Sequence, residues 1–150
     1  MEADTSTLRL PPPTHIGVVV RDIDEVAEYY TAMWGIGPWR KYEVSPSKEQ
    51  MLAGEPFRLK VALAQWGPLG LELLQPEDRK SVWSEFLKTH GGGLHHVCFD
   101  VSNWDAVVAQ LRKQSAKMVA GATRKDVRWC YFETKPGRLL IEIKQQLGQS

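Results

Sequence analysis

The stretch GGGLHHVCFDV, residues 91–101, places two adjacent histidines at the start of an apolar run that is typical of a buried strand. The chain has four histidines in 150 residues, so a neighbouring pair is conspicuous. A similar run, THIGVVV at residues 14–20, carries His15 near its start. The two runs align His15 with His96, and not with His95. This alignment predicts that the chain is built from two copies of one unit.

Each unit is predicted to hold a strand, a helix and three further strands, from the spacing of its apolar residues. In the first unit these elements are expected at residues 14–20, 21–34, 39–44, 57–66 and 71–76. In the second unit they are expected at residues 94–101, 102–114, 116–121, 126–134 and 139–145. Residues 45–56 are predicted to form a loop, and residues 78–90 a helix that links the units.

This organisation predicts a fold of the α+β class, with a flexible leader at residues 1–13 and a single domain at residues 14–145. Repeat one would span residues 14–76, and repeat two residues 94–145. Two βαβββ units can pair their sheets into one open mixed barrel around a central cleft. We therefore expect the chemistry of this protein to lie where the two units meet.

The composition excludes several classes of function. The net charge is +1, so the chain lacks the basic field that holds a nucleic acid. No apolar run approaches the roughly 18 residues of a membrane span, and the polar N-terminus lacks the apolar core of a secretion signal. We expect a cytoplasmic protein in which Cys98 and Cys130 are buried free thiols.

The repeat singles out one histidine and one glutamate in each unit. Glu72 lies among leucines and Glu142 between two isoleucines, both in predicted strands. An ionised carboxylate in an apolar strand is costly unless it is paired or binds a metal. Two imidazoles and two carboxylates, from His15, Glu72, His96 and Glu142, suit a divalent ion such as Co, Ni, Zn, Mn or Fe.

Five stretches together resemble the vicinal oxygen chelate superfamily, in its branch of methylmalonyl-CoA epimerase and glyoxalase I: HIGVVVRDIDEVAEYY, GIGPW, LELLQP, GLHHVCFDV and LLIEI. The resemblance covers about residues 14–145. It implies the glyoxalase/bleomycin resistance/dioxygenase fold and a divalent metal ion bound by His15, Glu72, His96 and Glu142. It also implies that Glu142 serves as a base at the metal, and, by analogy, that the protein is a homodimer.

The function implied by this resemblance is that of a metal-dependent isomerase, epimerase or lyase. Its substrate would be a small carbonyl compound or thioester, such as an acyl-CoA, that reacts through a metal-stabilised enolate. Two alternatives are an Fe(II)-dependent oxygenase of the same fold and a protein that binds a metabolite or drug without turnover. The presence of four ligands argues against both.

The chain departs from the epimerase pattern at one position. The epimerase places a second carboxylate on the third strand of its first half, which corresponds here to Lys60, Val61 or Ala62. The segment between Glu55 and Glu72 contains no acidic residue. We therefore expect Glu72 to take that catalytic role, as the second metal-bound glutamate does in glyoxalase I.

Several further residues are candidates for contact with the substrate because they lie in or beside predicted strands: Trp39, Gln65, Trp66, Arg128 and Trp129. Cys98 shares the face of His96 but has no identifiable activating base, so we do not expect a nucleophile there. Strict alternation along the strand directs His95 away from His96, towards a helix or an interface. On that basis His96→Ala would abolish metal binding and His95→Ala would preserve it.

Overall fold

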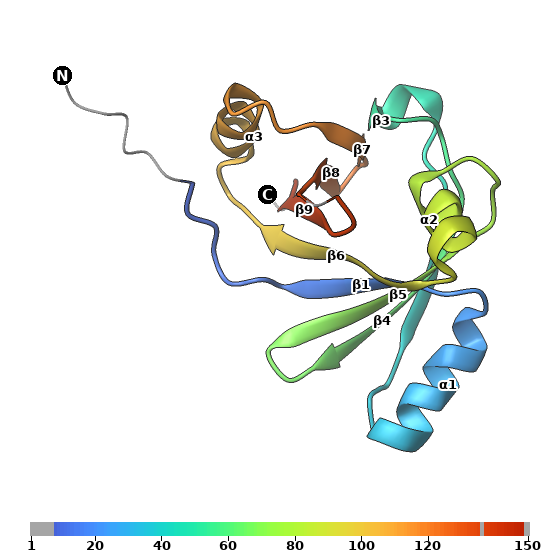
Figure 1. Ribbon diagram of the computed structural model, residues 1–150. Coiled ribbons are helices and arrows are strands. Elements are labelled where there is room, and N and C mark those ends of the chain that lie inside the picture. Colours follow the sequence, from blue (N-terminus) through green and yellow to red (C-terminus); the bar gives the residue numbers. More distant parts are fainter. Residues whose placement is uncertain (1–7, 136, 149–150) are drawn as a thin grey trace.

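A computed structural model describes residues 8–135 and 137–148 of the chain (Figure 1). Residues 1–7 of the predicted leader at 1–13 therefore lie outside the described residues, whereas Leu8 and Leu10 pack against the apolar core of the second half. The strands are β1 His15–Val19, β2 Arg40–Val44, β3 Met51–Ala53, β4 Leu59–Trp66, β5 Leu69–Pro76, β6 Gly93–Asp100, β7 Met118–Thr123, β8 Val127–Glu133 and β9 Leu140–Gln146. The helices are α1 Ile23–Trp34, α2 Val82–His90 and α3 Trp104–Lys113, with a short 3-10 turn at Lys48–Gln50. None of these helices is long and apolar enough to cross a membrane.

All nine strands form one curled, mixed sheet in the order β2-β4-β5-β1-β6-β9-β8-β7-β3. Within each half, the first and last strands run parallel, β1 beside β5 and β6 beside β9. The halves join through the antiparallel pair β1 and β6, which cross the centre of Figure 1. The structure thus confirms the predicted open mixed barrel of two βαβββ units, and it brings the four strands with the candidate ligands side by side.

The predicted loop at residues 45–56 is wrong in one respect, because it contains β3. This three-residue strand pairs antiparallel with β7, so a segment of the first half completes the sheet edge of the second half. A strand of this length has too few residues for alternation to reveal it. Its formation depends on the unpaired backbone groups of β7, which a distant segment of the chain satisfies.

The helices cover the two faces of the sheet unequally. Helix α1 packs Ile23 and Ala27 against Leu71 and Leu73 on the outer face of the first half. Helix α3 packs in the same way against Ile143 and its neighbours in the second half. Helix α2 instead places Trp83 on the concave face, where the side chain is fully buried. The linking helix therefore closes one end of the inner surface.

Helix ends follow the local sequence. Asp22 caps α1 by accepting a hydrogen bond from the Glu25 backbone N–H at 3.1 Å, and Gly35 ends the helix with a φ of 68°. Helix α2 begins at Val82, four residues later than expected from residue 78. The Asp78 carboxylate accepts the backbone N–H of Ser81 at 3.0 Å, which holds residues 78–81 in a turn before the helix.

The register of the central strands sets the candidate ligands in two rows that lie two residues apart along the strands. One row aligns His15 with Cys98 and Glu142, and the other aligns Glu72 with Gly17 and His96. Alternation therefore directs all four ligands to the concave face. Gly17 lies between Glu72 and His96, and a Cβ at Gly17 would lie 2.1 Å from His96 Cε1. The His96 ring occupies the space that a side chain at position 17 would need.

We expect Gly17→Ala to destabilise the fold by about 1–3 kcal/mol, because the new methyl group overlaps the His96 ring. Urea denaturation of Gly17→Ala, His96→Ala and the double variant measures this effect. Since the three closest atoms all belong to His96, the double variant should recover most of the loss caused by Gly17→Ala. Additive effects of the two substitutions would contradict this explanation.

Candidate metal centre

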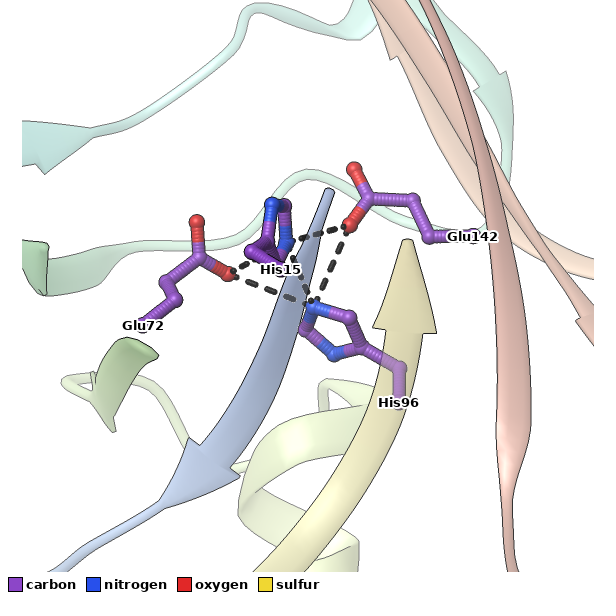
Figure 2. Close-up of side chains that lie close together, drawn as sticks. All are labelled: His15, Glu72, His96 and Glu142. Carbon is purple, nitrogen blue, oxygen red and sulfur yellow. Dashed lines mark hydrogen bonds and ion pairs between the residues drawn. The ribbon is translucent and has the colours of Figure 1, made fainter. Parts of the chain in front are cut away.

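The four candidate ligands converge on one point of the concave face (Figure 2). His96 Nε2 lies 3.2 Å from His15 Nε2, 3.1 Å from Glu142 Oε1 and 3.3 Å from Glu72 Oε1. His15 Nε2 lies 3.1 Å from Glu142 Oε1 and 3.5 Å from Glu72 Oε1. Figure 2 shows the glutamates approaching the imidazoles from opposite sides. Each of the four central strands supplies one member of the cluster.

Burial and mutual pairing determine the charge of this cluster. Burial disfavours ionisation of Glu142, but hydrogen bonds from His15 and His96 outweigh it and lower the pKa of this carboxyl to about 2. Burial likewise opposes the charge on Glu72, and the imidazoles lower its pKa below the ordinary range. Burial also opposes protonation of the imidazoles, yet the glutamates raise the pKa of both His15 and His96. Two ionised carboxylates are thus compensated by protonated imidazoles.

The spacing of these atoms fits a single metal ion. Donors bonded at about 2.1 Å to one ion lie about 3.0 Å apart at right angles and about 3.4 Å apart at tetrahedral angles. The nitrogen–nitrogen and nitrogen–oxygen distances of 3.1–3.5 Å fall on this range. All four ligand atoms lie within 4.8 Å of one another. Two nitrogens and two oxygens are the donors that borderline divalent ions prefer.

A cleft of about 540 Å³ opens from the cluster along the concave face. Aromatic side chains form part of its wall, with Phe57, Trp83, Trp129 and Tyr131 among the lining residues. Charged side chains also line it: the cations Arg40, Lys41, Arg124 and Lys144 and, outside the cluster, the acids Glu43 and Asp126. Such a cleft suits a ligand that has a small reacting centre and an anionic group.

Of the five residues predicted to contact the substrate, only Trp129 lines this cleft. Trp39 packs at α1 and donates its indole N–H to Thr31 Oγ1 at 2.9 Å. Gln65 and Trp66 are exposed at the turn between β4 and β5. Arg128 lies 4.8 Å from the Trp104 ring, on the side covered by α3. The structure does not bring these four residues to the metal cluster.

The reason lies in strand faces and strand ends. Arg128 precedes Trp129 on β8 and therefore points to the opposite face. Gln65 and Trp66 lie at the exposed end of β4, beside the turn to β5. The prediction used only the fact that these residues lie in or beside strands. Whether such a residue reaches the cleft depends on the face of the sheet to which it points and on its position along the strand.

Several cleft residues were missed by the sequence reasoning, and alternation reveals two of them. Tyr131 follows Trp129 at a spacing of two, and Lys144 follows Glu142 in the same way, so both share the concave face. Tyr42 and Phe57 carry no such signal, because their position depends on how the sheet curls. Glu142 faces the concave side, since the neighbouring Ile143 packs against α3 on the outer face.

Cys98 and Cys130 are buried free thiols, as predicted. Burial and the Glu142 charge raise the pKa of Cys98 to about 11. The thiol therefore stays protonated at neutral pH, which agrees with the expectation that it is no nucleophile.

The expectation for His95 is correct in part. Its ring packs against Phe86 and Trp83 of α2, so it faces a helix. It does not point away from His96, because the two Nδ1 atoms lie 3.0 Å apart. Gly17 pairs with His96 and Val18 with Leu94, which leaves His95 as the extra residue of a β-bulge. The bulge breaks strict alternation, and burial together with the neighbouring His96 lowers the pKa of His95 to about 3.

Three proteins that are named methylmalonyl-CoA epimerase resemble this chain. Human mitochondrial methylmalonyl-CoA epimerase is 28% identical over 137 residues, which cover 87% of this chain and 72% of that protein. The crystal structure of methylmalonyl-CoA epimerase from Mycobacterium tuberculosis has a TM-score of 0.72 at 24% identity. It covers 99% of this chain and 95% of that one.

A variant of the Streptomyces coelicolor methylmalonyl-CoA epimerase, in complex with 2-nitronate-propionyl-CoA, also has a TM-score of 0.72. It is 23% identical and covers 91% of this chain and 95% of that one. The sequence pattern of the glyoxalase/bleomycin resistance protein/dioxygenase superfamily matches residues 14–131. By sequence pattern and by fold, the chain belongs to this superfamily, also known as the vicinal oxygen chelate superfamily.

Proposed function

We propose that the protein binds one divalent metal ion through His15 Nε2, His96 Nε2 and one oxygen each of Glu72 and Glu142. The spacing of these four atoms supports the proposal, as does their burial beneath an open cleft. The carboxylates would balance the double positive charge of the ion, so the buried centre would be neutral. When bound, such an ion supplies Lewis-acid stabilisation of negative charge on a substrate oxygen.

Metal binding should release protons. Because the glutamates raise the pKa of His15 and His96, a cation must displace protons from these imidazoles before it binds. We expect on the order of one to two protons released per Co²⁺ or Zn²⁺, and an affinity that rises with pH. Calorimetric titration in buffers of different ionisation enthalpy measures the number of protons.

His96→Ala should abolish this binding, whereas His90→Ala serves as a control because His90 is exposed at the end of α2. Metal binding that is unchanged in His96→Ala, or independent of pH, would contradict the proposed site.

For the reaction, we propose removal and return of the proton α to a carbonyl, that is, an isomerase or epimerase reaction, with a lyase as the related possibility. Glu142 would act as the base on one side of the substrate. Glu72 would act on the other side, since the two carboxylates flank the imidazoles (Figure 2). Both groups are ionised, which is the protonation state that a base requires. Their opposed placement is the observation that carries this proposal.

The arrangement of β4 supports a role for Glu72. The epimerase pattern places a carboxylate near Lys60, Val61 or Ala62. Here Val61 lines the cleft, while Lys60 pairs with Glu77 at 3.2 Å and Ala62 packs in the outer core. Within the described residues, β4 thus offers no acid to the cleft. Glu72, on the neighbouring strand β5, is the carboxylate that lies in the cluster opposite Glu142, whereas the other acids that line the cleft, Glu43 and Asp126, are not part of the cluster.

We propose an anionic acyl-CoA thioester as the substrate. The human relative is a methylmalonyl-CoA epimerase, and one structural neighbour holds 2-nitronate-propionyl-CoA. The cationic residues around the cleft would attract the negative groups of such a compound. The aromatic wall formed by Trp129 and Tyr131 would exclude water from the reacting carbon.

Solvent deuterium exchange tests the reaction. We expect the Co²⁺-loaded protein to incorporate deuterium at the α-carbon of methylmalonyl-CoA, as followed by mass spectrometry. Glu142→Gln should slow the exchange by roughly 10²–10⁴-fold, because it removes the base. Glu133→Gln is the matched control, since Glu133 is an exposed carboxylate on the adjacent strand β8.

Three other experimental results would each favour a different function for this protein. Exchange into a hemithioacetal but not into an acyl-CoA would favour a glyoxalase-like reaction. Bound iron with oxygen uptake would favour an oxygenase. Tight binding of an aromatic compound without any turnover would favour a sequestering protein.

A further inference from the structure

His95 contacts the metal cluster from behind, through His96. The two Nδ1 atoms lie 3.0 Å apart, and the side chains are 1% and 0% exposed. Two bare imidazole nitrogens repel each other at this distance, so one of them must carry the hydrogen that the other accepts. The contact therefore defines a donor and an acceptor, although the distance alone does not show which is which.

The cluster decides this direction. His96 turns Nε2 towards His15, Glu72 and Glu142, at 3.1–3.3 Å. A metal ion at this point needs the lone pair of Nε2. In a neutral imidazole the hydrogen then resides on Nδ1, which faces His95. His96 must therefore donate, and His95 Nδ1 must accept.

Aromatic side chains around His95 hold its ring where Nδ1 can accept a hydrogen bond from His96. Phe86 meets its ring edge to face at 5.0 Å, Tyr131 lies at 5.5 Å and Trp83 at 6.3 Å between ring centroids. The β-bulge directs the side chain into this aromatic enclosure. Such packing leaves the imidazole little freedom to turn away from His96.

We propose that His95 is a positioning residue, whose Nδ1 accepts the Nδ1–H of His96 and thereby presents the His96 Nε2 lone pair to the metal ion. This inference rests on the metal site proposed above. Metal-bound histidines commonly donate to a carboxylate, a backbone carbonyl or water. A neutral imidazole in this place orients the ligand without adding negative charge to a centre that already holds two carboxylates.

Two nearly isosteric variants test the proposal. His95→Asn keeps an acceptor, because its amide oxygen occupies the same δ1 position as the ring nitrogen, whereas His95→Leu has none. We expect Leu to weaken Co²⁺ binding by about 10–100-fold, and Asn to weaken it by no more than about fivefold. Competition with a chelator measures the affinity, and the visible Co²⁺ spectrum reports the ligand geometry. Thermal unfolding checks that both variants fold.

Equal losses in the two variants would mean that His95 acts through packing alone, and unchanged affinity in Leu would mean that it does not act on the metal; either result overturns the proposal. A wild-type protein that binds no Co²⁺ would overturn the metal site itself, together with the role of His95. These failures are therefore distinguishable.

A measurement on the wild-type protein avoids the variants altogether. With Zn²⁺ bound to ¹⁵N-labelled protein, NMR should place the His96 proton on Nδ1. It should also detect a scalar coupling across the hydrogen bond between the two Nδ1 nitrogens. A proton on His95 Nδ1, with His96 Nδ1 bare, would overturn the proposal.

Discussion

Two ionised carboxylates, that of Glu142 buried and that of Glu72 partly buried, lie at the centre of the concave face, and the need to compensate their charge constrains the rest of the structure. Glu72 and Glu142 each approach both imidazoles within 3.5 Å. An unpaired carboxylate in this environment would cost several kcal/mol. The sheet therefore has to deliver two cationic or metal-bound imidazoles to the same point, and it does so by pairing its two halves through their first strands.

This pairing places strict demands on the strands. His15 and Glu142 lie in one row of the sheet, while Glu72 and His96 lie in another row two residues away, so a slip of one residue would turn a ligand to the outer face. The His96 ring lies over Gly17, where any side chain would collide with it. The fold and the site thus depend on the same strand register, because the register that closes the sheet also assembles the cluster.

The two faces of the sheet differ in character because of the same geometry. The outer face packs against α1 and α3 in two separate apolar cores. The concave face carries the polar cluster, and α2 supplies Trp83 to close its aromatic wall. His95 lies at the junction between this wall and the cluster, since it touches both Phe86 and His96. The His95 side chain thus packs in the aromatic core and also contacts the candidate ligand His96.

The sequence by itself determined the two-unit organisation and the positions of His15, Glu72, His96 and Glu142, because a repeat marks equivalent positions and alternation assigns a strand residue to a face. It did not reveal β3, whose three residues form a strand only beside β7. Nor did it separate Trp129 from Arg128, Gln65 and Trp66, since the curl of the sheet decides which strand residues reach the cleft. The place of His95 beside His96 was decided by a β-bulge, which arises from the pairing of β6 with β1 and has no counterpart in the pattern of either strand alone. Local patterns encode the faces of strands, whereas the contacts between distant strands exist only after the sheet has closed.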